Sequence, residues 1–256
     1  MTEPQRDGGL ELVDSMSDED FADILGPGGS ESRKGPDILT DQGFHCTDVG
    51  NGQRFAEAYR GLTRYCHAHG RWYIWDGRCW AVDATDVITS LAKGVAVDIY
   101  AEARGADSDG RRKELAKWAI GSESVQRLKG MIWAATTEPG MRVMPDELDA
   151  DPWKLNVLNG TIDLHTGELY AHRASDLITM LAPIEYGELA ECPRWEDFLD
   201  RIFERDADTI EFVQKAVGYS LTGCTHEQVL FVPWGTGANG KSTFIRTIQN
   251  VERLSF

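Results

Sequence analysis

The sequence lacks long hydrophobic runs and has few cysteines. No run of about 18 apolar residues occurs, which argues against a transmembrane helix. The N-terminal MTEPQRDGG is polar and acidic, unlike a signal peptide. The five cysteines form no Cys-x-x-Cys motif and no disulfide-rich pattern, which is typical of a reducing cytosol. We therefore expect a cytoplasmic protein without a membrane partner.

Basic residues are also scarce. The 256-residue chain has 26 lysines and arginines against 42 acids, a net charge of −16, which argues against a basic nucleic-acid coat protein. Residues 1–45 contain eleven acids and three bases and so hold half of that charge. Because charge is segregated, the remaining chain can still present a local basic surface to DNA.

The acidic segment 1–45 is predicted to be a disordered leader. Gly-Pro-Gly-Gly-Ser at 26–30 and Gly35-Pro36 oppose regular structure. Within it, SDEDFADILG places Phe21, Ile24 and Leu25 at helical spacing. This island is either a transient helical turn or a partner-docking motif that folds on binding.

The region after residue 46 is predicted to combine helices with small antiparallel hairpins. Apolar spacing from Asn51, a possible cap, predicts one helix that ends at Gly70, and the run RWYIWDGRCWAVD predicts a hairpin around Asp76-Gly77. The apolar face of that first helix would be formed by Phe55, Tyr59, Leu62, Tyr65 and Cys66.

Three helices and a loop are predicted next. Val87, Leu91, Val95 and Ile99 repeat every four residues, as on a buried helix face. A polar loop over 104–113 precedes helices at 111–120 and 123–136, with Ser122 as the N-cap of the second.

A second strand pair and two helices follow a connecting loop over 137–152. The segment NVLNGTIDLHTGELYAH predicts strands that turn at Thr166-Gly167 with one polar face. Pro193 opens a helix to about 204. A capping-box-like pair, Asp208 and Glu211, begins another helix that runs to Leu221.

The strongest chemical motif begins at Gly235. The strand-like run VLFVPW at 229–234 precedes Gly-Thr-Gly-Ala-Asn-Gly-Lys-Ser, which matches the phosphate-binding pattern GxxxxGK[ST], and 243–248 reads as a helix start. In such loops backbone N–H groups face the phosphates, the lysine reaches the β- and γ-phosphates, and the serine hydroxyl ligates Mg²⁺. The predicted nucleotide site comprises Gly235, Thr236, Gly237, Ala238, Asn239, Gly240, Lys241, Ser242 (through Mg²⁺) and Thr243.

Several ordered blocks surround this motif: NVLNGTIDLHTGEL, DLITMLAPIEY, CPRWEDFLDRIF, FVQKAVGYSLTG and EQVLFVPWGTGANGKSTF. From about residue 45 to 248 the chain closely resembles the phage and plasmid primase–helicase family, which includes satellite-phage primases and poxvirus-type primase–helicases. The resemblance implies ATP and Mg²⁺ as cofactors, DNA as partner, a homo-oligomeric ring, and ATP-dependent DNA unwinding by a superfamily 3 helicase during replication.

The same resemblance implies a domain order. A poxvirus-type primase N-terminal-like α+β domain would occupy 46–190, a helical linker 191–225, and the start of an α/β P-loop ATPase 226–256. Superfamily 3 helicases carry Walker B, sensor and arginine-finger residues downstream of the loop, yet only fourteen residues follow Ser242. We therefore expect a fragment without a complete catalytic set, from a truncated, split or frameshifted gene.

Alternatives to a helicase fragment stay open. The chain could be a non-catalytic module that binds DNA or a primase partner, with the loop as a remnant. A small-molecule P-loop kinase is disfavoured because such kinases usually carry the loop near the start of the domain.

Three weaker candidate sites also stay open. The basic group Arg111, Arg112, Lys113 and Lys117 is either a solvated helix face or a DNA-backbone contact.

Cys66, His67 and His69, with Cys46 and Cys79, fit no standard zinc spacing, so core and surface roles are favoured over a metal site.

The rings of Trp72, Tyr73, Trp75 and Trp80 are favoured as hairpin core over a base-stacking platform.

Overall fold

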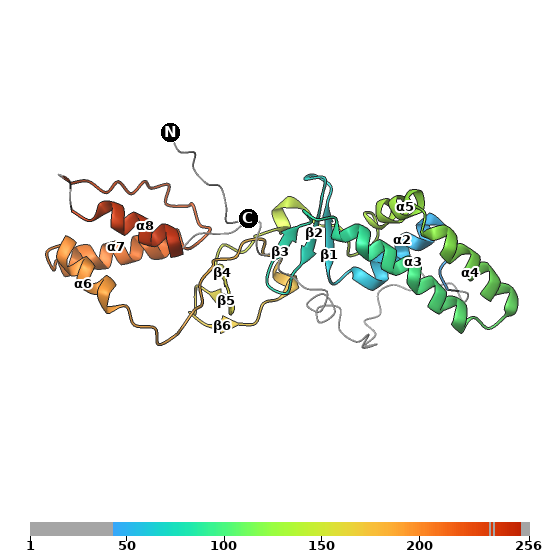
Figure 1. Ribbon diagram of the computed structural model, residues 1–256. Coiled ribbons are helices and arrows are strands. Elements are labelled where there is room, and N and C mark those ends of the chain that lie inside the picture. Colours follow the sequence, from blue (N-terminus) through green and yellow to red (C-terminus); the bar gives the residue numbers. More distant parts are fainter. Residues whose placement is uncertain (1–42, 236, 238, 252–256) are drawn as a thin grey trace, which may run out of the picture. The chain divides into compact units, whose positions relative to one another are not determined.

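The computed structural model describes residues 43–235, 237 and 239–251. These residues form two compact units (Figure 1). The N-terminal unit runs to Asp76 and from Trp80 to Leu148, and the C-terminal unit comprises Gly77–Cys79 and the chain from Asp149 onward. The predicted leader falls largely on residues 1–42 and, with its SDEDFADILG island, lies outside the described residues.

The N-terminal unit combines helices with a three-stranded antiparallel sheet of order β1-β2-β3. Helix α2 packs against α5, and α3 packs against α4. The main core is formed by Phe55, Ala56, Trp72, Ile88, Leu91, Ala92, Val95, Ala96, Leu128, Met131, Ala135 and Met141. The elements are α2 (Asp48–Tyr59), β1 (Thr63–Cys66), β2 (Arg71–Trp75), β3 (Trp80–Val82), α3 (Val87–Gly105), α4 (Asp109–Ser122), α5 (Val125–Ala135) and a 3-10 helix (Pro145–Glu147).

The first helix is shorter than predicted. Its N-cap is Thr47, whose hydroxyl accepts a hydrogen bond from the Gly50 N–H at 3.0 Å, whereas Asn51 lies buried inside the helix. The helix ends at Tyr59, and Leu62, Tyr65 and Cys66 do not extend its apolar face.

Strand β1 replaces the end of that helix. Tyr65 pairs with Trp72 across the sheet, with ring centroids 5.0 Å apart. On the other edge of β1, the Tyr65 N–H donates to Met141 O at 2.6 Å and the Val143 N–H donates to Tyr65 O at 3.1 Å. Hydrogen bonds on both edges and an aromatic cross-strand pair therefore favour strand over helix here.

The predicted hairpin is confirmed. Strands β2 and β3 pair antiparallel, with Trp75 opposite Trp80, and Gly77 in the turn has φ 94°. A side chain at that φ would be strained, so the glycine suits the turn.

Helices α3 and α4 extend further than predicted, whereas α5 (Val125–Ala135) is slightly shorter than the predicted 123–136. Helix α3 runs to Gly105, and α4 begins at Asp109 because the Ser108 hydroxyl accepts a hydrogen bond from the Arg111 N–H at 3.2 Å. The predicted loop over 104–113 therefore shrinks to 106–108. Ser122 is not a cap: it is the last residue of α4 and is buried, and α5 starts after Ser124.

The C-terminal unit contains a second antiparallel sheet, of order β4-β5-β6, whose core is Val157, Ile162 and Ala182. The predicted turn at Thr166-Gly167 is confirmed between β5 and β6. The predicted polar face is not solvent-exposed along its whole length, because Thr161 is buried and its hydroxyl donates to Asn156 Oδ1 at 2.9 Å. The elements are β4 (Lys154–Val157), β5 (Gly160–Asp163), β6 (Leu169–Tyr170), a 3-10 helix (Ala174–Asp176), α6 (Pro193–Ile202), α7 (Ala207–Ser220) and α8 (Lys241–Val251).

Helices α6 and α7 lie close to their predicted positions. The α7 cap is Asp206 rather than Asp208, because its carboxylate accepts hydrogen bonds from the backbone N–H groups of Asp208 and Thr209. None of the described residues of α6, α7 or α8 is buried.

The strand predicted at 229–234 does not form. No described strand pairs with it, and its apolar side chains stay in solvent, with Leu230 85% and Trp234 87% exposed. A strand needs a partner for its backbone hydrogen bonds, and the described residues supply none.

The fold class is mixed: helices accompany small antiparallel sheets, as predicted for the region after residue 46. Among the described helices, none is both long and apolar enough to cross a bilayer.

Candidate functional site

The Gly-rich loop leads directly into α8, whose first residue is Lys241. Gly237 and Gly240 adopt φ values of 103° and 83°, which favour glycine, and the Phe244 N–H donates to Gly240 O at 2.9 Å. Free N–H groups and partial positive charge at a helix start can hold an anion.

Lys241 folds back over this loop. Its ammonium donates to Gly235 O at 2.9 Å and to Asn239 Oδ1 at 2.7 Å. The ammonium of Lys241 is thus held by neutral acceptors of the loop rather than by a carboxylate, and its predicted contact with phosphates stays a prediction.

Gly235 lies in close contact with two side chains of the loop. A Cβ added there would lie 1.9 Å from Asn239 Nδ2 and 3.3 Å from Lys241 Nζ. A side chain at position 235 would therefore displace the Asn239 amide and the Lys241 ammonium from the backbone at this point.

Side chains of helix α6 pack against the loop, a contact that was not predicted from the sequence. A Cβ on Gly240 would meet Ile202 Cγ2 at 2.7 Å and Phe198 Cε2 at 3.0 Å. Trp195 stacks on Phe244 of α8, with centroids 5.5 Å apart and planes 19° apart. The available signal was the i, i+3, i+7 spacing of Trp195, Phe198 and Ile202.

The remaining predicted site residues differ in placement. Thr236 and Ala238 lie outside the described residues. Ser242 and Thr243 are exposed in the first turn of α8, and Thr243 O accepts a hydrogen bond from the Thr247 hydroxyl at 2.9 Å. The Mg²⁺ role of Ser242 stays a prediction.

The predicted basic group divides on α4. Arg111 pairs with Glu114 at 2.9 Å and also donates to Phe44 O, and Arg112 pairs with Asp109 at 2.7 Å. Lys113 and Lys117 are exposed, with no ion pair among the described residues. The two lysines are therefore the members of the group left available to an anion.

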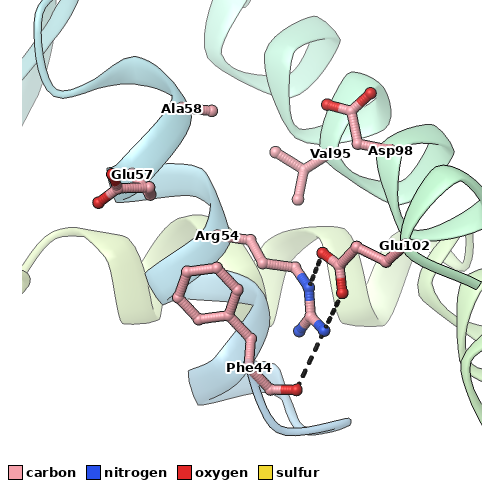
Figure 2. Close-up of a pocket in the computed structure, with 7 residues that line it drawn as sticks. All are labelled: Phe44, Arg54, Glu57, Ala58, Val95, Asp98 and Glu102. Atoms are coloured by element: carbon pink, nitrogen blue, oxygen red, sulfur yellow. Dashed lines mark hydrogen bonds and ion pairs between the residues drawn. The ribbon is translucent and has the colours of Figure 1, made fainter. Parts of the chain in front are cut away.

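A small cavity of about 160 Å³ lies between α2 and α3 (Figure 2). Figure 2 shows Arg54 reaching Glu102, with Phe44 beside them. The guanidinium is 4% exposed, and its Nε and Nη2 donate to the two Glu102 carboxylate oxygens at 2.6 and 2.7 Å. Arg54 also donates to His45 O and Phe44 O. This arginine therefore joins α2 to α3 and is not available to bind a ligand anion.

Asp98, on the rim of this cavity, is exposed but partly desolvated by its neighbours. Desolvation, followed by the negative charge of Glu102, raises the pKa of its carboxyl. The cavity thus has the acidic Asp98 at its rim, while the charges of Arg54 and Glu102 inside it offset each other.

Neither of the other weak candidates gains support. Within the described part of the chain, no three His, Cys, Asp or Glu side chains gather closely enough to hold a metal ion. Trp72, Tyr73 and Trp80 are buried and Trp75 is half-buried, so the hairpin rings serve the fold, as favoured from the sequence.

A family model described as D5 N terminal like matches residues 52–204, which is more than half of the chain. The chain belongs to this family, which occurs in replication proteins of the phage and plasmid primase–helicase type. The match covers the N-terminal unit from α2 onward, the second sheet and α6, and it ends before the Gly-rich loop. No curated protein matches the sequence.

Proposed function

We propose that the loop at 235–242 binds the triphosphate of ATP with Mg²⁺, and that the chain acts in DNA replication as part of a superfamily 3 helicase. The observation that carries the proposal is the position of Lys241. Its ammonium lies over a glycine-rich loop at a helix start, within 3 Å of neutral oxygens that a phosphate can replace.

The residues of the loop fit this ligand. The positive φ values of Gly237 and Gly240 suit glycine, and the absence of a side chain at Gly235 leaves room for the Asn239 amide and the Lys241 ammonium. Lys241 would exchange its contacts with Gly235 O and Asn239 for a phosphate oxygen, and the exposed Ser242 hydroxyl would face the metal. Mg²⁺, when bound, offsets phosphate charge.

The replication role rests on the family match. DNA unwinding by a ring of subunits is the activity that the family resemblance implies, and Lys113 and Lys117 are the lysines that would contact the DNA backbone. Contacts to phosphate release counterions, so binding that uses these lysines should weaken with salt.

A second candidate function is a module that binds DNA or a partner protein without using ATP. The observation in its favour is that residues 229–234 form no strand, so within the described residues the loop is not attached to the kind of sheet on which P-loop sites are built.

Nucleotide binding tests the first proposal. The full chain is titrated with a fluorescent ATP analogue in the presence of Mg²⁺, alongside Lys241→Ala. The matched control is Lys215→Ala, which removes an exposed α7 lysine that pairs with Glu211. We expect the wild type and the control to bind alike and Lys241→Ala to bind at least about tenfold more weakly, a loss of about 1.4 kcal/mol. No binding by the wild type would leave the second candidate in place.

DNA binding is tested separately with forked DNA at several salt concentrations. Lys113→Glu/Lys117→Glu should weaken binding and flatten its salt dependence by about two contacts. Lys93→Glu on α3 serves as the single-charge control. An unchanged salt slope in the double variant would contradict contact through α4.

A further inference from the structure

Helix α6 has one apolar face, and that face is turned to the Gly-rich loop. Trp195, Phe198 and Ile202 recur at i, i+3 and i+7 and are half-buried, whereas neighbouring polar residues of α6 are exposed. Since no residue of α6 is fully buried, the helix has no core of its own to complete.

The contact with the loop is made at Gly240. Phe198 and Ile202 approach so closely that a Cβ on Gly240 would lie 2.7 to 3.1 Å from their side-chain carbons. Gly240 precedes Lys241 and holds a φ of 83°. The two α6 side chains therefore border the backbone that sets the direction of the lysine.

A second contact joins α6 to α8. Trp195 stacks on Phe198 at 5.4 Å and on Phe244 at 5.5 Å between centroids, with interplanar angles of 27° and 19°. Phe244 donates its N–H to Gly240 O, so the end of the loop and the first turn of α8 share this aromatic stack. The stack thus fixes α8 against α6 on the side of the loop.

We propose that Trp195 and Phe198 are positioning residues of the nucleotide site: they hold Gly240 and the start of α8 so that the N–H groups and Lys241 converge on the phosphates. This inference rests on the proposed function. It makes α6 part of the nucleotide-binding unit rather than of a linker. It also places the indole of Trp195 against α8, the helix whose first turn would contact the phosphates.

The test measures binding of Mg²⁺-ATP to the full chain by calorimetry and by tryptophan fluorescence. Trp195→Ala and Phe198→Ala should each weaken binding by about five- to tenfold, in keeping with the loss of an aromatic contact. Trp195→Phe keeps the stack and should restore wild-type affinity, while the part of the nucleotide-dependent fluorescence change that comes from Trp195 should disappear. The matched control is Trp133→Ala, which removes a 73% exposed tryptophan from α5.

Each outcome is decisive. If the wild type binds and both alanine variants bind equally well, the positioning role is wrong while the proposed function stands. If Trp195→Phe binds as weakly as Trp195→Ala, the ring stack is not what holds the loop. If the wild type does not bind, the proposed function fails and the inference fails with it. Should an alanine variant lose helix content by circular dichroism, Trp195→Phe and Phe198→Leu still decide the role.

Discussion

The N-terminal unit and the helices α6 to α8 use apolar residues in opposite ways. In the first, large side chains such as Phe55, Ile99 and Met131 are fully enclosed. In the second, no described residue is buried, and side chains such as Phe212 remain more than half exposed. The N-terminal unit is therefore fixed by a core, whereas α6 to α8 are held by a few ring contacts near the loop.

That difference separates stability from function. A substitution in the N-terminal core should act on folding, while one in the contacts between α6 and α8 should act mainly on the loop that precedes α8. The following predictions test this contrast from the largest effect to the smallest.

The largest effect is expected at Phe55, which is 0% exposed and packs on Tyr59 and Trp72. Phe55→Ala should lower the free energy of unfolding by about 3 to 5 kcal/mol through lost burial and a cavity. Phe212→Ala, at a 59% exposed site on α7, should change it by less than about 0.5 kcal/mol. Urea unfolding followed by circular dichroism measures both, and equal losses would remove the contrast.

The buried ion pair should have the next largest effect. Glu102→Gln leaves the buried Arg54 guanidinium without its carboxylate and should cost about 2 to 3 kcal/mol. Glu114→Gln removes the partner of the more exposed Arg111 and should stay within about 0.5 kcal/mol. Similar costs for both variants in the same unfolding experiment would show that burial does not distinguish the two pairs.

Substitution of two helical glycines by alanine should change the stability in opposite directions. A Cβ on Gly52 of α2 would meet the Ala134 Cβ at 2.6 Å, so Gly52→Ala should destabilise by about 1 to 3 kcal/mol. Gly218 of α7 has open space, so Gly218→Ala should stabilise by about 0.5 to 1 kcal/mol through higher helix propensity. Thermal melts of the two variants provide the comparison, and a loss at Gly218 would mean that α7 packs more tightly than described.

The smallest effects concern pH. The raised pKa of Asp98 means that the folded state binds this proton more tightly than the unfolded state, so its contribution to stability improves as pH falls toward the ordinary value of about 3.9. Asp206 is the opposite case: the Thr209 hydroxyl, then the Thr209 N–H, lower its pKa, so its cap is lost as pH falls below that value.

Melting temperatures across this acid range test both signs. Asp98→Asn should melt slightly higher than the wild type at neutral pH, and the difference should vanish in acid. Asp206→Asn should melt slightly lower at neutral pH and converge with the wild type only at lower pH. Parallel curves for either variant would contradict the assigned direction.

Local signals in the sequence predicted local structure well. Asp76-Gly77 between aromatic runs was sufficient for the β2–β3 hairpin, since a hairpin depends on neighbours in the chain, whereas the nucleotide role that the GxxxxGK[ST] spacing gives Lys241 stays a prediction. Strand β1 was missed because the apolar residues of 62–66 also fit a helical period. Its pairing with β2 is local, but the hydrogen bonds on its other edge come from Met141 and Val143, more than seventy residues away.

The candidate site shows the same limit. The packing of α6 against the loop depends on contacts between Phe198 and Gly240 and between Trp195 and Phe244, which are some forty to fifty residues apart in sequence. No periodicity within either segment predicts which helix lies beside the loop. The strand expected at 229–234 also depended on distant partners, and a local apolar run could not supply them.

The buried amide of Asn51 fixes the position of α2 along α4 in the N-terminal unit. Its Nδ2 donates to Ser122 Oγ at 2.9 Å, while its Oδ1 accepts from Trp118 Nε1 at 2.9 Å and from Arg54 Nη1 at 3.5 Å. If α2 slid by one turn against α4, the Asn51 amide would lose both Ser122 and Trp118 and would keep only Arg54 of its own helix, whereas apolar neighbours could simply re-pack. The network therefore makes a packing of α2 and α4 shifted by one turn less stable than the observed one. The residue responsible, Asn51, adds no apolar surface to the core.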